Sequence, residues 1–358
     1  MPESSATPSV AVIGSLNLDT MLHVPHLPQP GATVMTSGWE ARYGGKGANQ
    51  ALAAMRQGAE VSLIGCVGDD PVGSAYVTSL HEQGLNVLGI QPLQETQTGR
   101  AYVCVDPQGQ NTIVVAPGAN GFLSADLVLA HHAILESADV VLCQCEVPVE
   151  ATVVALQRAS ELGRTTILNP SPINPEFPWG QVSIDFLIVN EKEAAALLGY
   201  FVESTNEAST VRSQMADLGV GTLIITRGKE HTFAFSPNQA LKVPPPAVDV
   251  VDTTGAGDAF AGAFAVHWAL TRNLLGSLRK ANIAGALTAT RVGAQEAIPT
   301  REEVDYFGKP PPLPESEREP EPEYEPEPAP EPEPEYSGDE ELPQESGEPG
   351  EEEERAKA

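Results

Sequence analysis

Residues 251–258 read Val-Asp-Thr-Thr-Gly-Ala-Gly-Asp and stand directly before residues 259–270, an apolar stretch typical of a buried helix. Gly255 and Gly257 let the backbone turn sharply, so the N–H groups of this turn lie at a helix N-terminus. Free N–H groups and the helix dipole make such a terminus a site for anions. Asp258 adds a carboxylate at the same place. This combination suits a reaction in which a hydroxyl loses its proton while a phosphoryl group is transferred.

Asp258 also has a simpler explanation, because an Asp at the start of a helix most often caps it by accepting hydrogen bonds from orphan N–H groups. A second dense motif lies far upstream, where residues 43–51 read Tyr-Gly-Gly-Lys-Gly-Ala-Asn-Gln-Ala. Its spacing is not that of a P-loop, since Gly47 stands where the P-loop has a hydroxyl. The two motifs can act together only if the fold brings them to one place.

Short apolar runs typical of buried strands alternate with helical stretches along most of the chain. This alternation predicts an α/β fold in which a mostly parallel central sheet has helices on both faces, a three-layer α/β/α sandwich. We expect this domain to span residues 10–307, after a disordered segment of residues 1–9. The predicted strands are residues 10–13, 61–67, 140–143, 166–168, 186–189 and 223–226, and the predicted helices are residues 46–57, 151–162, 191–198, 210–218 and 259–270.

Two segments, residues 17–43 and 96–118, break this alternation. Apolar and polar residues alternate within them, and turn signals lie between, as at Pro30-Gly31 and at residues 107–109. This pattern is typical of antiparallel strands. We therefore expect a small second sheet over one edge of the main domain. Such a sheet would act as a lid that excludes water from a site of phosphoryl transfer.

Residues 308–358 are a low-complexity segment rich in Pro and Glu, with too few apolar residues to offset the entropy lost on ordering. We expect an extended, disordered tail with polyproline II character. It holds nineteen Asp and Glu against four Lys and Arg, a net charge of −15 out of −29 for the whole chain. The rest of the chain is also acidic and has no basic patch, which disfavours nucleic acid as a partner. The sequence does not say what partner, if any, the tail has.

No window approaches twenty apolar residues, so we expect no membrane-spanning helix. The first ten residues lack both the basic and the apolar region of a secretion signal. The four cysteines are expected to be buried, reduced thiols rather than a metal site; they are Cys66, Cys104, Cys143 and Cys145. A cytoplasmic protein is the expectation.

Gly44-Gly45-Lys46-Gly47, together with the motif of residues 252–258, resembles the paired signature of the ribokinase/PfkB family of carbohydrate kinases, over about residues 10–307. Within that family, residues 14–19 (GSLNLD) and 44–51 (GGKGANQA) are similar to the ribokinases. The resemblance implies a ribokinase-like fold, ATP with Mg²⁺ as phosphoryl donor, K⁺ as activator, and transfer to the 5-hydroxyl of D-ribose. Asp258 would be the general base, and Gly255, Ala256 and Gly257 would form the anion hole. The resemblance also implies a homodimer formed through the lid sheets, which would cover their exposed edges.

The sugar-binding residues implied by the resemblance are Asn17, Asp19, Gly45, Lys46, Asn49, Glu146 and Asp258. A carboxylate and an amide suit a vicinal diol, because each hydroxyl both donates and accepts a hydrogen bond. From the sequence alone, Asn17 and Asp19 could instead form a turn that leaves the first strand. Glu146 could instead be the carboxylate at the start of the helix that follows Pro148.

The nucleotide-binding residues implied by the resemblance are Asn190, Thr226, Gly228, Gly257 and Asn282. Glu193 would act on Mg²⁺ through water, since Mg²⁺ keeps several waters and needs few protein carboxylates. Asn190 and Glu193 would at the same time form a capping box. The monovalent cation would be bound by Asp252 and Thr254, by the backbone near Thr288, Arg291 and Gly293, and by Ala297.

Substrate identity is the more open question. The pattern also fits a kinase for 2-deoxyribose or for another sugar of the family. Arg100, in the second lid segment, would either contact a phosphate or carboxylate of a different substrate or face solvent or a neighbouring subunit. Two alternatives lie outside catalysis: a sugar sensor that does not turn its ligand over, and an interaction scaffold that works through the tail.

Overall fold

The computed structural model describes residues 7–307. The predicted tail and residues 1–6 of the predicted N-terminal segment lie outside the described residues, so those predictions stay predictions. The strand β1 begins at Ser9, where disorder was predicted, and this end of the prediction was wrong. Ser9 is ordered because its N–H donates to Asp139 Oδ2 at 2.9 Å and its hydroxyl donates to Ser137 O at 2.8 Å.

A nine-stranded sheet runs through the domain in the order β13-β12-β11-β10-β9-β8-β1-β4-β5. All neighbours from β11 to β5 are parallel, and β12 and β13 complete one edge as an antiparallel hairpin. After β1 the chain builds first toward β5 and later, from β8, in the opposite direction. Ligands of open α/β sheets bind at the carboxyl ends of the strands where the order reverses in this way. The strands are β1 (Ser9–Ile13), β4 (Glu60–Gly68), β5 (Asn86–Leu93), β8 (Val140–Gln144), β9 (Thr165–Asn169), β10 (Ile184–Asn190), β11 (Val220–Thr226), β12 (Thr232–Phe235) and β13 (Ala240–Val243).

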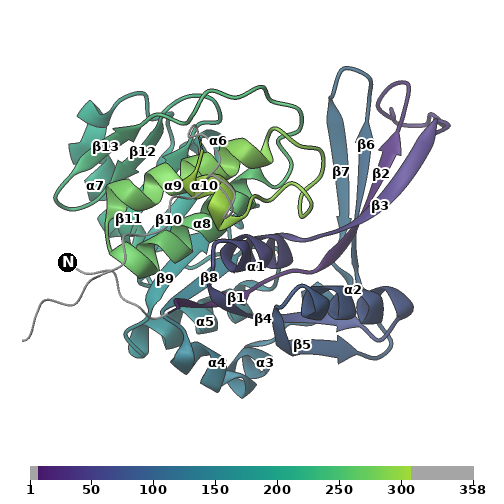
Figure 1. Ribbon diagram of the computed structural model, residues 1–358, viewed down its shortest axis with the longest axis horizontal. Coiled ribbons are helices and arrows are strands. Elements are labelled where there is room, and N and C mark those ends of the chain that lie inside the picture. The colour runs from purple at the N-terminus through teal and green to yellow at the C-terminus, as the bar shows by residue number, and fades with distance from the viewer. Residues whose placement is uncertain (1–6, 308–358) are drawn as a thin grey trace, which may run out of the picture. The chain divides into compact units, whose positions relative to one another are not determined.

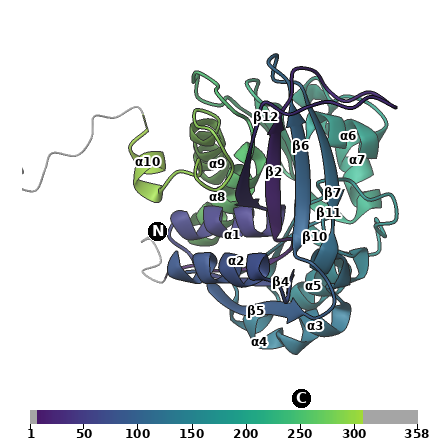
Figure 2. The ribbon, with the colours of Figure 1, turned by 90° about the vertical axis from the view of Figure 1, so that its right-hand side faces the viewer.

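Helices cover both faces of this sheet, as Figures 1 and 2 show. One apolar core lies between the sheet and α1, α2, α8, α9 and α10, and a second core lies between the opposite face and α3 to α7. This is the three-layer sandwich that the alternating pattern predicts, and the prediction is confirmed. The helices are α1 (Lys46–Arg56), α2 (Pro71–Glu82), α3 (Ala125–Ala130), α4 (His132–Ser137), α5 (Val149–Glu161), α6 (Glu191–Leu198), α7 (Ala208–Leu218), α8 (Ala256–Thr271), α9 (Leu274–Thr288) and α10 (Arg301–Asp305), with 3₁₀ turns η1 (Gly118–Phe122) and η2 (Thr205–Glu207).

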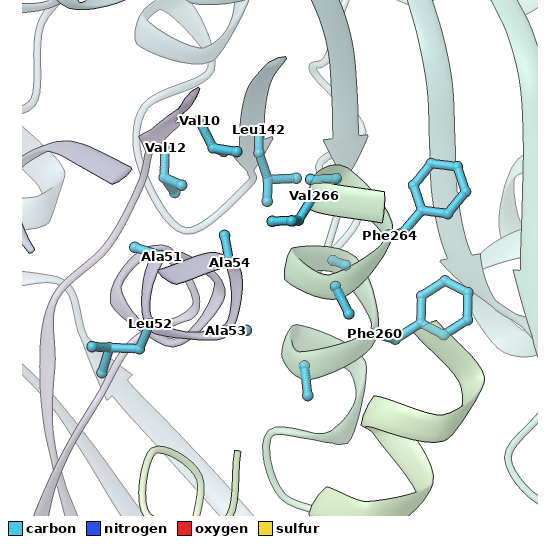
Figure 3. Close-up of a cluster of buried hydrophobic side chains, with 14 of the residues drawn as sticks. Val10, Val12, Ala51, Leu52, Ala53, Ala54, Leu142, Phe260, Phe264 and Val266 are labelled. Carbon is cyan, nitrogen blue, oxygen red and sulfur yellow. The ribbon is translucent and has the colours of Figure 1, made fainter. Parts of the chain in front are cut away.

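The helices α1 and α8 pack against each other over β1 and β8 (Figure 3). Their close approach depends on Gly262, because a Cβ there would lie 2.5 Å from Ala53 Cβ and 2.7 Å from Gln50 O. Real Cβ atoms do not come so near, so only glycine fits at this crossing. The two sequence motifs, at the N-termini of α1 and α8, are thereby brought side by side.

A second sheet of four strands has the order β3-β2-β6-β7. β2 pairs with β3 antiparallel and with β6 parallel, and β7 is antiparallel to β6. Figure 1 shows this sheet above α2 and to the right of α1, to one side of the main sheet. The small sheet expected from the two segments that break the alternation is therefore present. Its strands are β2 (Asn17–His23), β3 (Gly38–Gly44), β6 (Gly99–Val105) and β7 (Asn111–Ala116).

Some local expectations need correction. Cys66, Cys143 and Cys145 are buried free thiols, but Cys104 lies in the lid strand β6 and is half-exposed, because only one face of that strand lies toward the rest of the domain. Helix α8 begins at Ala256, earlier than the predicted residue 259, since Ala256 and Gly257 form its first turn. No helix of the described part of the chain has the length and apolar character that crossing a membrane requires.

Candidate active site

The N-terminus of α8 carries the Gly-rich motif. Gly255 is the N-cap residue with φ of 75°, a left-handed conformation that favours glycine, and no side chain caps the helix. The first N–H groups of an α-helix have no acceptor within the helix. Here the N–H of Ala256 donates to Thr253 O at 3.2 Å, so the unpaired donors among the described residues are the N–H groups of Gly257 and Asp258. Asp258 lies in the first turn and is only 6% exposed.

The carboxylate of Asp258 does not cap its helix, so the capping alternative was wrong. Its Oδ2 accepts a hydrogen bond from Asn49 Nδ2 at 3.0 Å, and its Oδ1 accepts one from Gln50 Nε2 at 2.9 Å. Both amides belong to α1, so the two motifs meet in one hydrogen-bonded group. The close α1–α8 crossing is what makes these short contacts possible.

A cavity of about 370 Å³ opens between the second sheet and the N-termini of α1 and α8. We call it the lid cavity. Every sugar-site residue predicted from the sequence lines it, together with the first residue of the expected anion hole: Asn17, Asp19, Gly45, Lys46, Asn49, Glu146, Asp258 and Gly255. The inner face of the second sheet forms its far wall through Met21, Ala101, Val103, Ile113 and Val115.

Asp19 is a polar group of the lid cavity with an oxygen that is unpartnered within the described part of the chain. Its Oδ1 is buried and has no hydrogen-bond partner among the described residues. Burial, together with the nearby carboxylates of Glu146 and Asp258, raises the pKa of Asp19 to about 7. Gly44 on β3, which pairs with Asn17 and lies diagonally across from Asp19, leaves the necessary space, since a Cβ there would lie 2.0 Å from Asp19 Oδ2. Asp19 is a strand residue, so the turn alternative for it was wrong.

Glu146 follows the carboxyl end of β8 and is anchored from two sides. Its Oε2 accepts from Ser15 Oγ at 2.5 Å and from the N–H of Lys46 at 3.1 Å. Pro148, not Glu146, is the N-cap of α5, so the helix-start alternative was wrong. The carboxylates of Asp258 and Glu146 raise the pKa of Lys46 above its ordinary value, which keeps this ammonium charged inside the cavity.

Asn17 begins β2 and is held in a fixed orientation. Its Oδ1 accepts from Asn120 Nδ2 at 2.8 Å, and the same amide of Asn120 bonds the backbone of Leu16 on both sides. Because the Oδ1 of Asn17 faces Asn120, the Nδ2 donor of Asn17 points away from Asn120. Asn17 therefore offers a donor close to the acceptor Asp19.

A second cavity, of about 410 Å³, lies on the other side of the α8 N-terminus. We call it the outer cavity. Four of the predicted nucleotide-site residues line it, namely Thr226, Gly228, Gly257 and Asn282, and so does Ala256 of the expected anion hole. Apolar residues of segment 245–250 and Phe260 form much of the remaining wall. Thr253 lines both cavities, so they meet at the Gly-rich turn.

Asn190 and Glu193 lie outside both cavity walls, at the start of α6. They form the predicted capping box, in which Asn190 Oδ1 accepts from the N–H of Glu193 and Glu193 Oε2 accepts from the N–H of Asn190, each at 2.9 Å. Asn190 pairs with Thr226 in the β10–β11 register, which places it beside the outer cavity. The carboxylate of Glu193 also contributes to the raised pKa of Lys46.

The residues expected around a monovalent cation lie in two loops that Asp252 joins. Asp252 Oδ2 accepts from the N–H of Gly293 at 2.9 Å, and its Oδ1 accepts from both the N–H and the hydroxyl of Thr254. The N–H of Arg291 donates to Thr288 O at 3.1 Å, which closes the turn after α9. Ala297 is fully buried and has only its carbonyl oxygen to offer. The described residues contain no cluster of three His, Cys, Asp or Glu suited to a metal ion.

Several residues of the site were not foreseen. Arg42, Tyr43 and the apolar inner face of the second sheet line the lid cavity, and segment 245–250 lines the outer cavity. The run of three prolines at residues 244–246 could have indicated a rigid wall. Arg100 stands one residue from Ala101 on β6, and in a strand successive side chains point to opposite faces. Since Ala101 lines the cavity, Arg100 lies on the outer face, away from it.

Comparison with known proteins agrees with this geometry. Residues 7–301 match the sequence profile of the pfkB family of carbohydrate kinases. The chain belongs to that family. Ribokinase of Haemophilus influenzae is 34% identical over 299 residues, which cover 84% of this chain and 98% of that protein. Deoxyribokinase of Salmonella typhimurium is 29% identical over 299 residues, 83% of this chain and 98% of that protein.

Solved structures of the pfkB family share the fold. Ribokinase from Giardia lamblia superposes with a TM-score of 0.77 at 26% identity, covering 84% of this chain and 98% of that one. Ribokinase from Arabidopsis thaliana, solved in complex with ribose and ATP, gives a TM-score of 0.75 at 28% identity, with 84% and 98% covered. The expected fold, a mostly parallel main sheet with a small second sheet, is thus confirmed.

Proposed function

We propose that this protein is an ATP-dependent sugar kinase that transfers the γ-phosphoryl group of ATP to the 5-hydroxyl of D-ribose, giving D-ribose 5-phosphate and ADP. The observation that carries the proposal is the meeting of two cavities at the N-terminus of α8. Asp258 faces the lid cavity, Gly257 faces the outer cavity, and Thr253 lines both. A sugar in the first cavity and a nucleotide in the second would bring an acceptor hydroxyl and a terminal phosphate to the same helix end.

The polar groups of the lid cavity suit a small polyol. Asp19 Oδ1 lacks a partner among the described residues, and a buried acceptor of this kind gains most from a donating hydroxyl. Asn17 offers a donor beside it, and together they match the two-way hydrogen bonding of a vicinal diol. Glu146 and Lys46 supply a further acceptor and donor on the wall nearest α1.

The proposed reaction uses these placements as follows. The 5-hydroxyl oxygen attacks the γ-phosphorus and forms a new O–P bond, the bond between that phosphorus and the β–γ bridging oxygen breaks, and ADP leaves. Asp258 accepts the hydroxyl proton. The N–H groups of Gly257 and Asp258 and the helix dipole would stabilise the negative charge on the transferring group, while the N–H of Ala256 donates to Thr253 O. Positioning and electrostatics supply most of the rate enhancement in reactions of this class.

The outer cavity suits an adenine nucleotide, and the similar ribokinase from Arabidopsis thaliana was solved in complex with ribose and ATP. Its apolar wall offers a surface for a flat base, and Thr226, Gly228 and Asn282 lie around it. Asn190, beside Thr226 in the sheet, would contact the phosphate end.

Two metal ions belong to the proposal. Glu193 would hold Mg²⁺ through water, with one oxygen free while the other completes the capping box. Asp252, with backbone oxygens near Thr254, Thr288, Arg291, Gly293 and Ala297, would hold K⁺. Mg²⁺ bound there would neutralise charge on the phosphates, and K⁺ bound near Asp252 would stiffen the loop next to the anion hole. Asp252 fits this role, since it already ties residue 293 to residue 254.

A kinase for 2-deoxyribose is the nearest alternative, because the chain is also similar to a deoxyribokinase. The two sugars differ by one hydroxyl, and the polar residues of the lid cavity would accommodate both. Arg100 lies on the outer face of the second sheet and would not contact a phosphorylated sugar; the arginine that lines the lid cavity is Arg42, which is paired with Glu40. A sensor without turnover is disfavoured by the intact group of Asp258 and the Gly-rich turn.

The proposed assembly is a homodimer formed through the lid sheets. β7 is an edge strand whose six residues are all exposed, including Ile113, Val114 and Val115, and exposed apolar edge strands are usually covered in the working protein. The proposed compartment is the cytoplasm, which suits the four free thiols.

The experiment is ATP-dependent ADP release measured with ribose, 2-deoxyribose, fructose, fructose 6-phosphate and adenosine, each with and without K⁺. The proposal predicts the highest kcat/KM with ribose and a higher rate when K⁺ is present. A preference for 2-deoxyribose would move the substrate assignment but keep the mechanism. Absence of turnover with every sugar, despite measurable ribose binding, would overturn the catalytic proposal in favour of the sensor.

A further inference from the structure

The Asp258 carboxylate stands at the end of two separate chains of buried hydrogen bonds. In the first chain, the hydroxyl of Tyr76 donates to Gly44 O at 2.7 Å and accepts from Gln295 Nε2 at 2.6 Å. The same Nε2 donates to Asn49 Oδ1 at 3.1 Å, and Asn49 Nδ2 donates to Asp258 Oδ2 at 3.0 Å. The side chains that link Gly44 to Asp258 are at most 6% exposed.

The second chain reaches the other carboxylate oxygen. Asn169 Nδ2 donates to Ile188 O at 2.8 Å, and Asn169 Oδ1 accepts from Gln50 Nε2 at 2.9 Å. Gln50 Nε2 also donates to Asp258 Oδ1 at 2.9 Å, while Gln50 Oε1 accepts from Gln144 Nε2 at 2.7 Å. Gln50 and Gln144 are completely buried.

Both chains are directional because each begins at a backbone carbonyl, which can only accept. Gly44 O takes the one hydrogen of Tyr76, so Gln295 must turn its Nε2 toward that hydroxyl and toward Asn49. Asn49 then accepts this hydrogen bond on its Oδ1, so only its N–H groups can face Asp258. In the same way Ile188 O orients Asn169, and Asn169 orients Gln50. A side-chain amide has a donor end and an acceptor end of nearly the same shape, and here the distant carbonyls decide which end faces Asp258.

We propose that Gln295 and Gln50 are positioning residues for phosphoryl transfer, which fix the donor ends of the two α1 amides against the two oxygens of Asp258. This inference rests on the proposed function. An N–H on each oxygen fixes the plane of the carboxylate and so the direction in which its remaining lone pairs point. Each oxygen keeps a second lone pair, and Asp258 faces the lid cavity. Small displacements of a reacting group lower kcat strongly, so the orientation of these amides bears directly on the rate.

The kinetic test is Gln295→Glu, which keeps the shape of the side chain but replaces its donor end with an acceptor. Asn49 would then turn its Nδ2 toward residue 295 and its oxygen toward Asp258, which repels the carboxylate. We expect kcat to fall about 10–100-fold. Because Asn49 also lines the lid cavity, the KM for ribose should rise as well, but by a smaller factor than the fall in kcat. The matched control is Gln57→Glu. Gln57 follows α1, is 1% exposed and donates to Pro299 O at 3.0 Å, away from Asp258, so its kcat should stay within about twofold.

A milder variant covers the case in which Gln295→Glu does not fold. Tyr76→Phe keeps the ring that stacks on Tyr43 at 4.1 Å between centroids and removes only the hydroxyl that orients Gln295. We expect kcat to fall about fivefold, the worth of one hydrogen bond, with KM for ribose unchanged. An equal loss in kcat and in ribose affinity, or an unchanged kcat in folded protein, would overturn the positioning role.

A stability test decides whether the chain is directional, independently of activity. Asp258→Asn puts an N–H₂ where a carboxylate oxygen was, so Asn49 should turn its oxygen toward it and its Nδ2 toward residue 295. The carboxylate that Gln295→Glu introduces would accept a hydrogen bond from that Nδ2. The double variant Asp258→Asn/Gln295→Glu should therefore have a higher free energy of unfolding than the sum of the changes in the two single variants predicts. We expect the coupling to change the unfolding equilibrium constant about fivefold or more in urea titrations. In the control double variant Asp258→Asn/Gln57→Glu, the changes in unfolding free energy should be additive.

The two tests separate the failure of this inference from failure of the proposed function. If Asp258→Asn and Gln295→Glu are coupled in stability but the wild-type protein turns over no sugar, the directional hydrogen-bond chain stands and its role in catalysis is overturned. Ribose turnover in the wild type, with additive stabilities and an unchanged kcat in Gln295→Glu, would overturn the positioning role and leave the proposed function standing.

Discussion

Asp19, Glu146 and Asp258 place three carboxyl groups around one cavity, with Lys46 as the cation among them. Carboxyl groups at close range raise one another's pKa. Here the pKa of Asp19 is raised to about 7, mainly by burial and further by the nearby Glu146 and Asp258. A bound sugar would relieve this by donating to the carboxylate. Asp19 is therefore the group through which pH should act on the sugar site.

We predict that kcat/KM for ribose falls as the pH is lowered through about 7, because Asp19 becomes protonated in the free protein and loses acceptor capacity. In Asp19→Asn this dependence should disappear and the KM for ribose should rise. A pH series of initial rates from about pH 5.5 to about pH 8.5, which brackets this pKa, measures both effects. A wild-type profile that is flat across pH 7 would contradict the role of Asp19.

Asp19 makes stability depend on pH in the opposite direction: kcat/KM should rise with pH, whereas the contribution of Asp19 to the free energy of unfolding should fall. With a folded-state pKa near 7 and an ordinary value of 3.8, the folded protein holds this proton through a pH range in which the unfolded chain has lost it. The contribution of Asp19 to stability is therefore present at low pH and is lost as the pH rises from about 4 to about 7. Asp19→Asn should melt at a higher temperature than the wild type at pH 8, with the difference shrinking toward pH 4, in scanning calorimetry without sugar. Equal melting temperatures at pH 8 would contradict the raised pKa.

At the scale of elements, the site depends on how closely α1 approaches α8. Gly262→Ala would place a methyl group 2.5 Å from Ala53 Cβ and 2.8 Å from Ala54 N, so the helices must separate. We predict a loss of about 1–3 kcal/mol in unfolding free energy together with a lower kcat, because Asn49 and Gln50 move away from Asp258. Urea unfolding and steady-state kinetics measure the two effects.

The control for this prediction is Gly276→Ala in α9. A Cβ there would lie 3.4 Å from the nearest atom, Asn273 Cγ, which is an ordinary contact distance. Replacing glycine by alanine inside a helix stabilises it by up to ~1 kcal/mol. If Gly262→Ala behaved like Gly276→Ala, the close crossing would not be what holds the site together.

The elements that were predictable are those with a clear periodicity or a strong motif. The buried strands around β1 and β8 and the apolar helix α8 have such patterns, and the predicted fold is confirmed. The β12–β13 hairpin and α9 were not predicted, because β12 and β13 are only four residues long and α9 mixes small and polar residues. Asn282 on α9 could therefore be assigned only by resemblance.

The site was predictable where one motif holds several of its residues, as with Gly45, Lys46 and Asn49. Gln50 stands in the same motif, yet the sequence cannot show that it bonds Asp258. Gln295, Gln144 and Asn169 carry no local signal at all, since their roles arise from contacts between segments far apart in the chain. The roles of the predicted residues remain proposals that the experiments above address.

At the scale of the whole molecule, the kinase elements end before the acidic segment begins. The family match ends at residue 301, and α10 ends at Asp305. We predict that deletion of residues 309–358 leaves kcat and the KM values for ribose and ATP within about twofold, a change near the scatter of distant, independent sites. A larger loss, restored by adding the free tail peptide, would place the tail in the catalytic cycle.

The proposed dimer makes a further prediction. Val114 is 62% exposed on the edge strand β7, and Val114→Lys would put a charge into an apolar contact between lids. We expect sedimentation velocity to show a dimer for the wild type and a monomer for this variant. Leu88→Lys, at an 82% exposed site on the other sheet, should remain a dimer. A monomeric wild type would contradict the dimer, as would a dimeric Val114→Lys.

The central claim is that Asp258 takes the proton of a sugar hydroxyl at the point where the two cavities meet. The most direct measurement compares Asp258→Asn with the wild type, using ADP release for turnover and isothermal calorimetry for ribose binding. We expect a folded variant that binds ribose within a few-fold of the wild type while kcat falls by about 10²–10⁴, the usual contribution of a general base. Near-normal turnover in the folded variant would contradict it.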